Sequence, residues 1–69
     1  MKLSPREIKI LDLLSKGCTS DDISVKAEMN IHTIKTYRKN LMIKFNAQNV
    51  THLVALAIEK GYLDDLTSS

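Results

Sequence analysis

The sequence predicts an all-α fold: a compact four-helix domain of 69 residues that contains a helix-turn-helix. Four stretches place Ser, Thr or Asn second, where it can cap a helix, and an aliphatic residue sixth. Apolar residues then recur at the spacing of one helix face, and no stretch alternates in the manner of a strand. We expect helices at about residues 5–16, 20–27, 31–45 and 50–60. They form a single domain over residues 1–69, with residues 1–2 and about 64–69 frayed.

The first helix has a complete start signal in "LSPREI". Ser4 can cap the helix, Pro5 takes the first helical position, where its missing N–H costs nothing, and Glu7 can reach back to the cap. Gly17, which suits the left-handed residue after a helix, ends it. The expected inner face consists of Ile8, Leu11 and Leu14, with Ile10 at its margin.

The second and third helices are separated by only about three residues, which is the helix-turn-helix arrangement. Thr19 caps the short second helix, with Asp22 as its return acid, and the helix ends near Ala27. Asn30, in "MNIHTI", caps the third helix. Its expected core arc is Ile31, Ile34, Tyr37, Leu41, Met42 and Phe45, and its opposite face holds His32, Lys35, Thr36, Lys39 and Ile43.

The fourth helix starts in "QNVTHL" and stops at Gly61. Asn49 is its cap, and His52 in its first turn is a solvated or capping residue. Its expected buried arc is Val50, Leu53, Val54, Ala57 and Ile58.

Composition excludes several classes of protein. A hydrophobic content of 43% supports a packed core, while no run approaches the ~20 apolar residues of a membrane span. No secretion signal opens the chain, so we expect a cytoplasmic protein. The lone Cys18 excludes an internal disulfide and is expected to be a small buried hydrophobe. Without a Ser-His-Asp set, metal-ligand spacing or a phosphate loop, we expect no enzyme, no cofactor and no metal site.

The charge distribution is more informative than the net charge of +2. Residues 29–58 hold Lys35, Arg38, Lys39 and Lys44 but not one acid. Such a cationic block suits a polyanionic partner, and it equally suits a solvated helix face. Aromatic residues that could stack on RNA bases are nearly absent, which makes RNA a poorer partner than duplex DNA.

Four segments in register resemble the LuxR-type, or GerE-like, helix-turn-helix domain of bacterial transcription regulators. The family's Leu-Thr-Pro-Arg-Glu is similar to residues 3–7, its Leu-Leu-x-x-Gly to residues 13–17, its Thr-Val-Lys-x-His-Arg to residues 33–38 and its Asn-x-Thr-x-Leu-Val to residues 49–54. The resemblance covers nearly the whole chain. It departs at residues 27–29, where the family is more apolar, and at Asn46, where Gly is usual.

The resemblance implies a sequence-specific regulator that binds double-stranded DNA through the helix at 31–45 and lies on the nucleoid when bound. It places base contacts at Lys35, Thr36 and Lys39, which the helical wheel also points away from the core. Family members dimerise through the last helix, usually as the output domain of a response regulator or a signal-binding protein. RNA polymerase is a further partner that the family suggests.

The third helix start differs from the first two because Thr33 stands where they carry Glu7 and Asp22. Its positive end therefore stays free for an anion such as a DNA phosphate, unless Thr33 is merely a tolerated first-turn residue. Our phosphate candidates are Thr33, His32, Tyr37 and Lys44. His32 could instead contact bases, and Tyr37 could simply complete the core.

Two further expectations concern assembly. Arg38 lies beside the apolar arc, so we expect it to pair with Glu7 as a structural ion pair. Following the resemblance, the dimer strip is Thr51, Ala55 and Leu56, too small for a firm dimer without an inverted-repeat DNA site. The alternative function is a helical protein-interaction module that uses its basic helix on an acidic partner.

Overall fold

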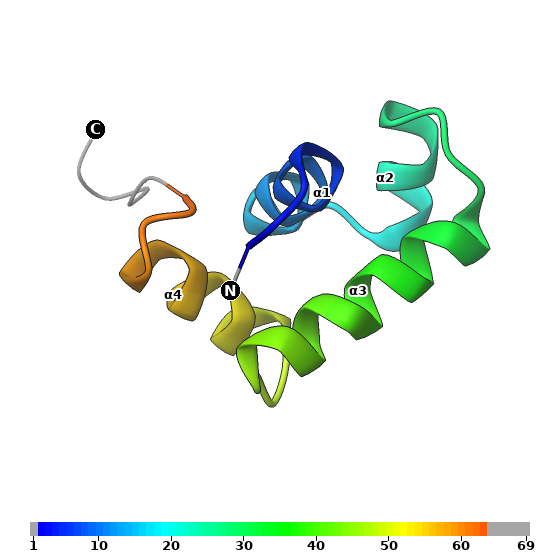
Figure 1. The fold of residues 1–69 in the computed structure, drawn as a ribbon. Helices are drawn as coiled ribbons and strands as arrows, with labels where there is room; N and C mark the ends of the chain where they lie inside the picture. Colours follow the sequence, from blue (N-terminus) through cyan, green and yellow to red (C-terminus); the bar gives the residue numbers. More distant parts are fainter. Residues whose placement is uncertain (1, 64–69) are drawn as a thin grey trace.

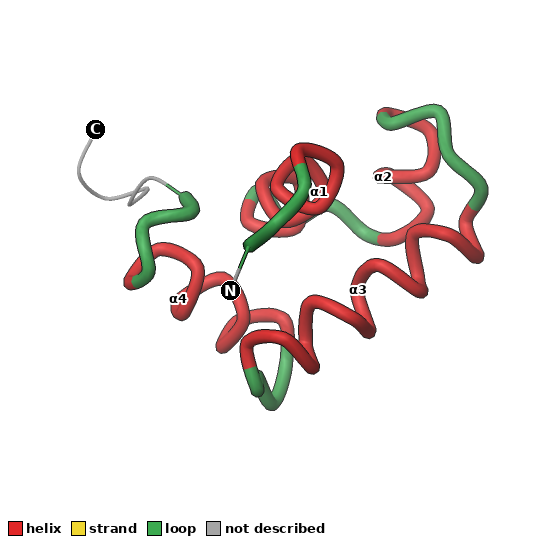
Figure 2. Tube along the Cα trace, in the orientation of Figure 1, coloured by secondary structure: helices red, strands yellow, loops and turns green. Residues whose placement is uncertain are grey.

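Four helices follow one another along the chain: α1 (Pro5–Ser15), α2 (Ser20–Lys26), α3 (Ile31–Phe45) and α4 (Val50–Glu59) (Figure 1). They are seen in a computed structural model that describes residues 2–63. The fraying expected at residue 1 and at about 64–69 lies outside the described residues, and Lys2 is exposed and non-helical. Within the described residues only helices, turns and loops occur, so the all-α prediction is confirmed (Figure 2).

The predicted capping boxes set the starts of the first two helices. Ser4 Oγ accepts from the Glu7 amide at 3.1 Å, and the Ser4 amide donates to Glu7 Oε1 at 3.0 Å. Thr19 and Asp22 repeat this exchange at 3.1 and 3.0 Å. Because these bonds satisfy amides that a helix cannot serve internally, they define where each helix begins. The four predicted helices agree with the observed bounds to within one residue.

α3 is the longest of the four described helices and, like α1, packs against each of the other three. In Figure 1 it runs as a long diagonal below α1 and α2, with α4 at its far end. The core that they enclose consists of Ile10, Leu11, Leu14, Ile23, Ile34, Leu41, Phe45, Leu53 and Ala57. Ile10 is fully buried and Ile8 only half-buried, so the expected order of these two residues on α1 is wrong.

The predicted arcs of α3 and α4 are broader than the observed core. Ile34, Leu41 and Phe45 of α3 are buried, whereas its other predicted core residues are half-buried. On α4 only Leu53 and Ala57 are buried. A small domain has too little interior to cover every apolar side chain on a helix. Partly exposed apolar side chains therefore remain on α4.

The turn between α2 and α3 closes without glycine. Glu28 takes the left-handed conformation, with φ of 54°. Ser24 ties the turn, because its hydroxyl donates to the Met29 carbonyl at 2.6 Å and its carbonyl accepts from the Met29 amide at 3.0 Å. Asn46 after α3 is also left-handed, with φ of 53°, and Asn tolerates this region better than most residues. Both the turn before α3 and the turn after it therefore use a left-handed residue that is not glycine, Glu28 and Asn46 respectively.

Candidate nucleic-acid interface

α3 turns a continuous stripe of side chains away from the core. His32, Lys35, Thr36, Lys39 and Ile43 are all exposed, as the helical wheel predicts. The Thr36 hydroxyl donates to the His32 carbonyl at 3.0 Å. This bond uses the hydroxyl proton within the helix, so the methyl group and the oxygen lone pairs remain for an external partner. The stripe therefore offers ammonium donors beside an apolar contact group.

One flank of this stripe is a groove shared with α4. The groove has a volume of about 230 Å³ and is lined by Lys35, Arg38, Lys39, Met42 and Val50. Val50 is the first residue of α4, so that helix begins beside the two lysines. The long stems of lysines can cover an apolar floor while their ammonium groups reach outward. The arrangement concentrates positive charge along the outer edge of α3.

Arg38 does not pair with Glu7, so that expectation is wrong. Arg38 Nη1 donates to Ser20 Oγ at 2.6 Å, and Ser20 is the first residue of α2 and 8% exposed. A helical wheel gives the angle of Arg38 on α3 but not the height at which α1 or α2 crosses it. At that height the helix meets the start of α2. The guanidinium therefore joins the two helices of the helix-turn-helix.

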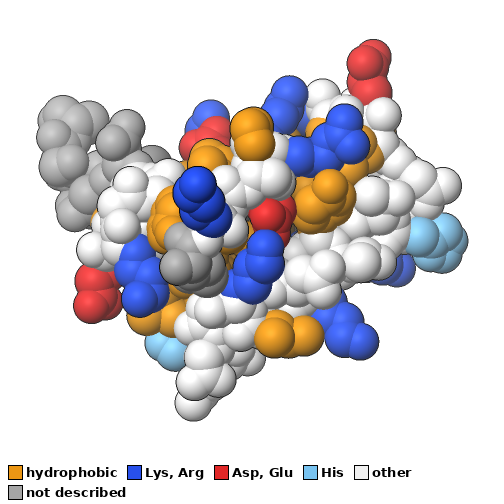
Figure 3. Space-filling model, viewed as in Figure 1, with side chains coloured by type: hydrophobic (Ala, Val, Ile, Leu, Met, Phe, Trp, Pro, Cys, Tyr) orange, Lys and Arg blue, Asp and Glu red, His pale blue; other side chains and the backbone are white. Residues whose placement is uncertain are grey.

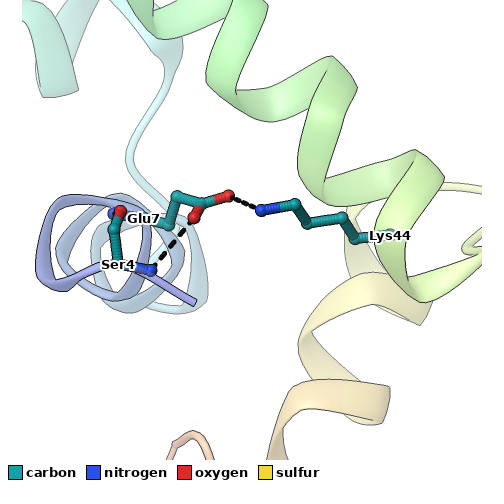
Figure 4. A network of polar contacts seen from close by, with 3 residues as sticks. All are labelled: Ser4, Glu7 and Lys44. Atoms are coloured by element: carbon teal, nitrogen blue, oxygen red, sulfur yellow. Dashed lines mark hydrogen bonds and ion pairs between the residues drawn. The ribbon is translucent and has the colours of Figure 1, made fainter. Parts of the chain in front are cut away.

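Glu7 instead pairs with Lys44. Lys44 lies six residues beyond Arg38 on α3, or about 9 Å along the helix axis at 1.5 Å per residue. Lys44 Nζ lies 2.6 Å from Glu7 Oε2, and the Ser4 amide bonds the other carboxylate oxygen (Figure 4). Glu7 is 7% exposed. The Lys44 ammonium and, next, the Ser4 amide hold the pKa of Glu7 below its ordinary value. Lys44 is thus engaged inside the protein, which makes it the weakest of the phosphate candidates.

No carboxylate neutralises the positive end of the helix dipole in the first turn of α3. Asn30 Oδ1 accepts from the His32 amide at 2.8 Å, and Thr33 is exposed. No acid lies in this turn, nor in the first turn of α4. At α4, however, the side chain at the third helical position also reaches back, because His52 Nδ1 accepts from the amide of Gln48, the residue before the cap, at 3.1 Å. Among the described helices, α3 is therefore the one whose start has neither a carboxylate nor a substitute for it.

Tyr37 lies on the opposite flank of α3 from the lysine groove. It is half-buried and packs against the core, and it also lines a pocket of about 580 Å³. The pocket floor includes Ile10 and Met29, and Arg6 and Lys9 of α1 stand at its wall. Both predicted roles of Tyr37 remain compatible with this position. Sequence reasoning missed the two α1 cations, although their spacing of three residues places them on one helix face.

Cys18 makes one further polar contact among the described residues. Cys18 is half-buried against the core, and Lys26 Nζ approaches its Sγ at 3.6 Å. Within residues 2–63 no group of His, Cys, Asp and Glu could hold a metal ion, and no helix is long and apolar enough to cross a membrane. Figure 3 shows Lys and Arg side chains spread between apolar ones over the face that it presents.

The family and the relatives to which this chain is compared below are described as regulators. Residues 1–57 match the family described as "Bacterial regulatory proteins, luxR family". The chain is 36% identical over 63 residues to the transcriptional regulatory protein FixJ of Bradyrhizobium diazoefficiens, covering 91% of this chain and 31% of FixJ. It is 34% identical over 62 residues to the oxygen regulatory protein NreC of Staphylococcus epidermidis, covering 90% of this chain and 28% of NreC.

A third relative is the transcription regulator BvgA of Bordetella pertussis. It is 36% identical over 55 residues, which cover 80% of this chain and 26% of BvgA. The chain thus spans less than a third of the length of each of these relatives. Their names describe regulators and not enzymes. Together with the four-helix fold and the exposed stripe on α3, the match shows that the chain belongs to the LuxR family of bacterial DNA-binding transcription regulators.

Proposed function

We propose that the chain binds duplex DNA sequence-specifically, with α3 in the major groove. Lys35, Thr36 and Lys39 contact base edges. The observation that carries the proposal is the exposed stripe of α3, which lies in a segment, residues 29–58, without a single acid. A lysine ammonium can donate to the O6 and N7 atoms of guanine, and a threonine methyl can contact the methyl of thymine. The Thr36 hydrogen bond to His32 supports the contact with thymine, because it engages the hydroxyl within the helix and leaves the methyl group of this exposed residue for an external partner.

The phosphates of the two strands then flank the stripe. The acid-free start of α3, at Thr33 and His32, is where one phosphate would meet helix amides. Tyr37 reaches the backbone on the side that faces α1. Lys44 contributes only if it leaves Glu7, from which it is 2.6 Å away. These contacts hold the protein in register but carry no sequence information.

We also propose that two copies meet through α4 on an inverted-repeat site. Thr51 and Ala55 are exposed, as this requires, whereas Leu56 packs against the core and does not fit the strip. Val54 and Ile58 take its place, because they are half-buried and, among the described residues, do not belong to the apolar side chains packed on the core. The revised strip is Thr51, Val54, Ala55 and Ile58, a line with helical spacing.

The surroundings of the revised strip suit a second helix. A pocket of about 340 Å³ opens beside it, lined by Leu14, Ser15, Gly17, Val50, Thr51 and Val54. The strip is short, and interfaces under ~1,200 Å² are typically weak, so pairing becomes firm only when both copies are on DNA. A two-fold dimer places its recognition helices about one DNA turn apart. The DNA-bound dimer would act on transcription by contacting RNA polymerase or by covering its site.

The test is to select bound sequences from random duplex DNA and to measure affinity for the best site. Lys35→Ala and Lys39→Ala should each cost about 1–3 kcal/mol, or roughly 5- to 150-fold, on that site and relax its preference. Lys60→Ala is the control, because Lys60 is an exposed lysine after α4, away from α3. Equal losses on selected and random DNA would make the residue a phosphate contact. Salt-dependent binding without any base preference would favour the acidic-partner module instead.

A further inference from the structure

α3 carries a large apolar side chain on its outward face, near its C-terminal end. Ile43 is 67% exposed, although the neighbouring Leu41 and Phe45 are buried in the core. At 100° per residue, Ile43 lies within about 20° of Thr36 and within about 40° of Lys39. The spacing 32, 36, 39 and 43 therefore forms one straight line along the helix. Ile43 is thus a member of the exposed stripe and not an outlier at its edge.

The position of Ile43 along the helix also matters. At 1.5 Å per residue it lies about 6 Å beyond Lys39 and about 10 Å beyond Thr36. These distances correspond to about two and three steps of a DNA strand at 3.4 Å per nucleotide. A helix that places Thr36 and Lys39 on base edges therefore carries Ile43 toward bases further along the same groove.

The charge around Ile43 indicates what could cover it. Ile43 lies in the cationic segment 29–58, so a polyanion is favoured as its partner, whereas a basic peptide would find no acid in this segment to pair with. Val25, the other large hydrophobic residue that is exposed among those described, is 77% exposed. It lies in α2, whose first turn carries Asp21 and Asp22, and these would repel a polyanion. Of these two described residues, Ile43 is the one that lies in a segment with basic residues and no acid.

We propose that Ile43 reads the methyl group of a thymine, and so sets the base preference at one position beyond those contacted by Lys39. Thymine's C5 methyl is the apolar group that base pairs present in the major groove, and cytosine lacks it. The inference rests on the proposed function, because it requires α3 to lie in that groove. It makes Ile43 a further specificity-determining residue, with a partner of defined chemistry.

The experiment uses the selected best site, in which each thymine is replaced in turn by deoxyuridine. This change removes one methyl group and leaves the hydrogen-bonding edge intact. For the unmodified protein, one replacement at the far end of the half-site should weaken binding about fourfold, the value of one buried methyl group. Ile43→Ala should bind both versions of that position equally, and Ile43→Val should keep part of the difference. Any methyl effect opposite Thr36 should persist in both variants.

The outcomes separate this inference from the function on which it rests. If Ile43→Ala retains the same response as the unmodified protein at every thymine, while Lys39→Ala still relaxes the preference, the inference fails and the proposed function stands. A uniform change on selected and random DNA would place Ile43 at the phosphates and also overturn it. If the unmodified protein shows no base preference at all, both fail together. Thermal unfolding confirms that the variants fold, which the exposure of Ile43 leads us to expect.

Discussion

At the scale of single residues, one carboxylate joins two distant parts of the chain. Each oxygen of Glu7 has its own donor: the Ser4 amide at 3.0 Å and the Lys44 ammonium at 2.6 Å. A buried charge is costly unless it is paired and hydrogen-bonded, and Glu7 is only 7% exposed. The same group therefore caps α1 and ties that cap to the last third of α3 (Figure 4).

Glu7→Gln should lower the free energy of unfolding by about 1–2 kcal/mol at pH 7, since hydrogen bonds to charged groups contribute about 1.5–3 kcal/mol and Lys44 is partly solvated. Gln can still accept from the Ser4 amide, so the change isolates the charge. The folded pKa of Glu7 is lowered, first by Lys44, so the unfolded chain binds more protons as the solution is acidified. The stabilisation is complete above about pH 4.3 and is lost as pH falls through the folded pKa.

Denaturant unfolding at a series of pH values measures this difference. The gap between the unmodified protein and Glu7→Gln should narrow on acidification. Asp12→Asn is the control, because Asp12 and Lys16 form an exposed pair, with side chains 46% and 59% exposed, at 3.0 Å. Such pairs contribute about 0–1 kcal/mol. A gap between Glu7→Gln and the unmodified protein that stayed constant down to low pH would show that the Lys44 pair does not stabilise the fold.

At the scale of elements, each of the four helices begins with a Ser, Thr or Asn cap whose side chain accepts from an amide of the first turn. The four starts differ at the third helical residue. That residue is Glu7 in α1, Asp22 in α2, Thr33 in α3 and His52 in α4. The Thr19 amide and then its hydroxyl hold the pKa of Asp22 below its ordinary value. The charged form of this carboxyl group is therefore favoured at the N-terminus of α2, as the helix dipole predicts. The starts of α3 and α4 have no carboxylate at this position, although the helix dipole would favour one. At α3, the proposed phosphate contact would account for the absence.

Thr33→Glu should therefore separate stability from binding. A carboxylate in the first turn of α3 should raise the free energy of unfolding by about 0.3–1 kcal/mol through the helix dipole. It should also weaken all DNA binding about fivefold or more at low salt, by repelling the phosphate at that end. Thr33→Gln is the matched control, because the Gln side chain has nearly the same size as that of Glu but carries no charge. Unchanged affinity of Thr33→Glu at low salt would contradict a phosphate site at this helix end.

At the scale of the whole molecule, the features that could be predicted from the sequence are those set by residues close together in the chain. Features set by packing between distant helices could not be predicted. Caps and helix bounds depend on residues three or four apart, so "LSPREI" and "CTSDDI" were enough to predict them. The partner of Arg38 depends on where along α3 the other helices cross it, and the spacing of apolar residues in the sequence does not give that position. For the same reason Leu56 was assigned to the outer strip, although it packs against the core. The exposed stripe of α3 was predicted because a long, regular helix fixes its own faces.

The whole fold also decides which surfaces can act together. Because α3 packs on α1, α2 and α4 alike, its outward stripe is the part of the helix that no other element covers. The start of α4 lies beside the lysine groove of α3, and the revised strip of α4 lies on the face of that helix away from its buried Leu53 and Ala57. The proposed DNA-reading surface and the proposed pairing surface therefore lie on different helices packed on the same core.

This separation gives the prediction for association. Ala55→Glu places a charge at the centre of the revised strip, where the two-fold axis would set it against its own copy. Cooperative occupation of an inverted repeat should be lost, while binding to an isolated half-site stays nearly unchanged. Ala55→Ser is the control, since it keeps the small size without the charge. Titration of half-site and full-site DNA measures the cooperativity, and sedimentation counts the copies bound. One copy per full site in the unmodified protein, with no effect of Ala55→Glu, would contradict pairing through α4.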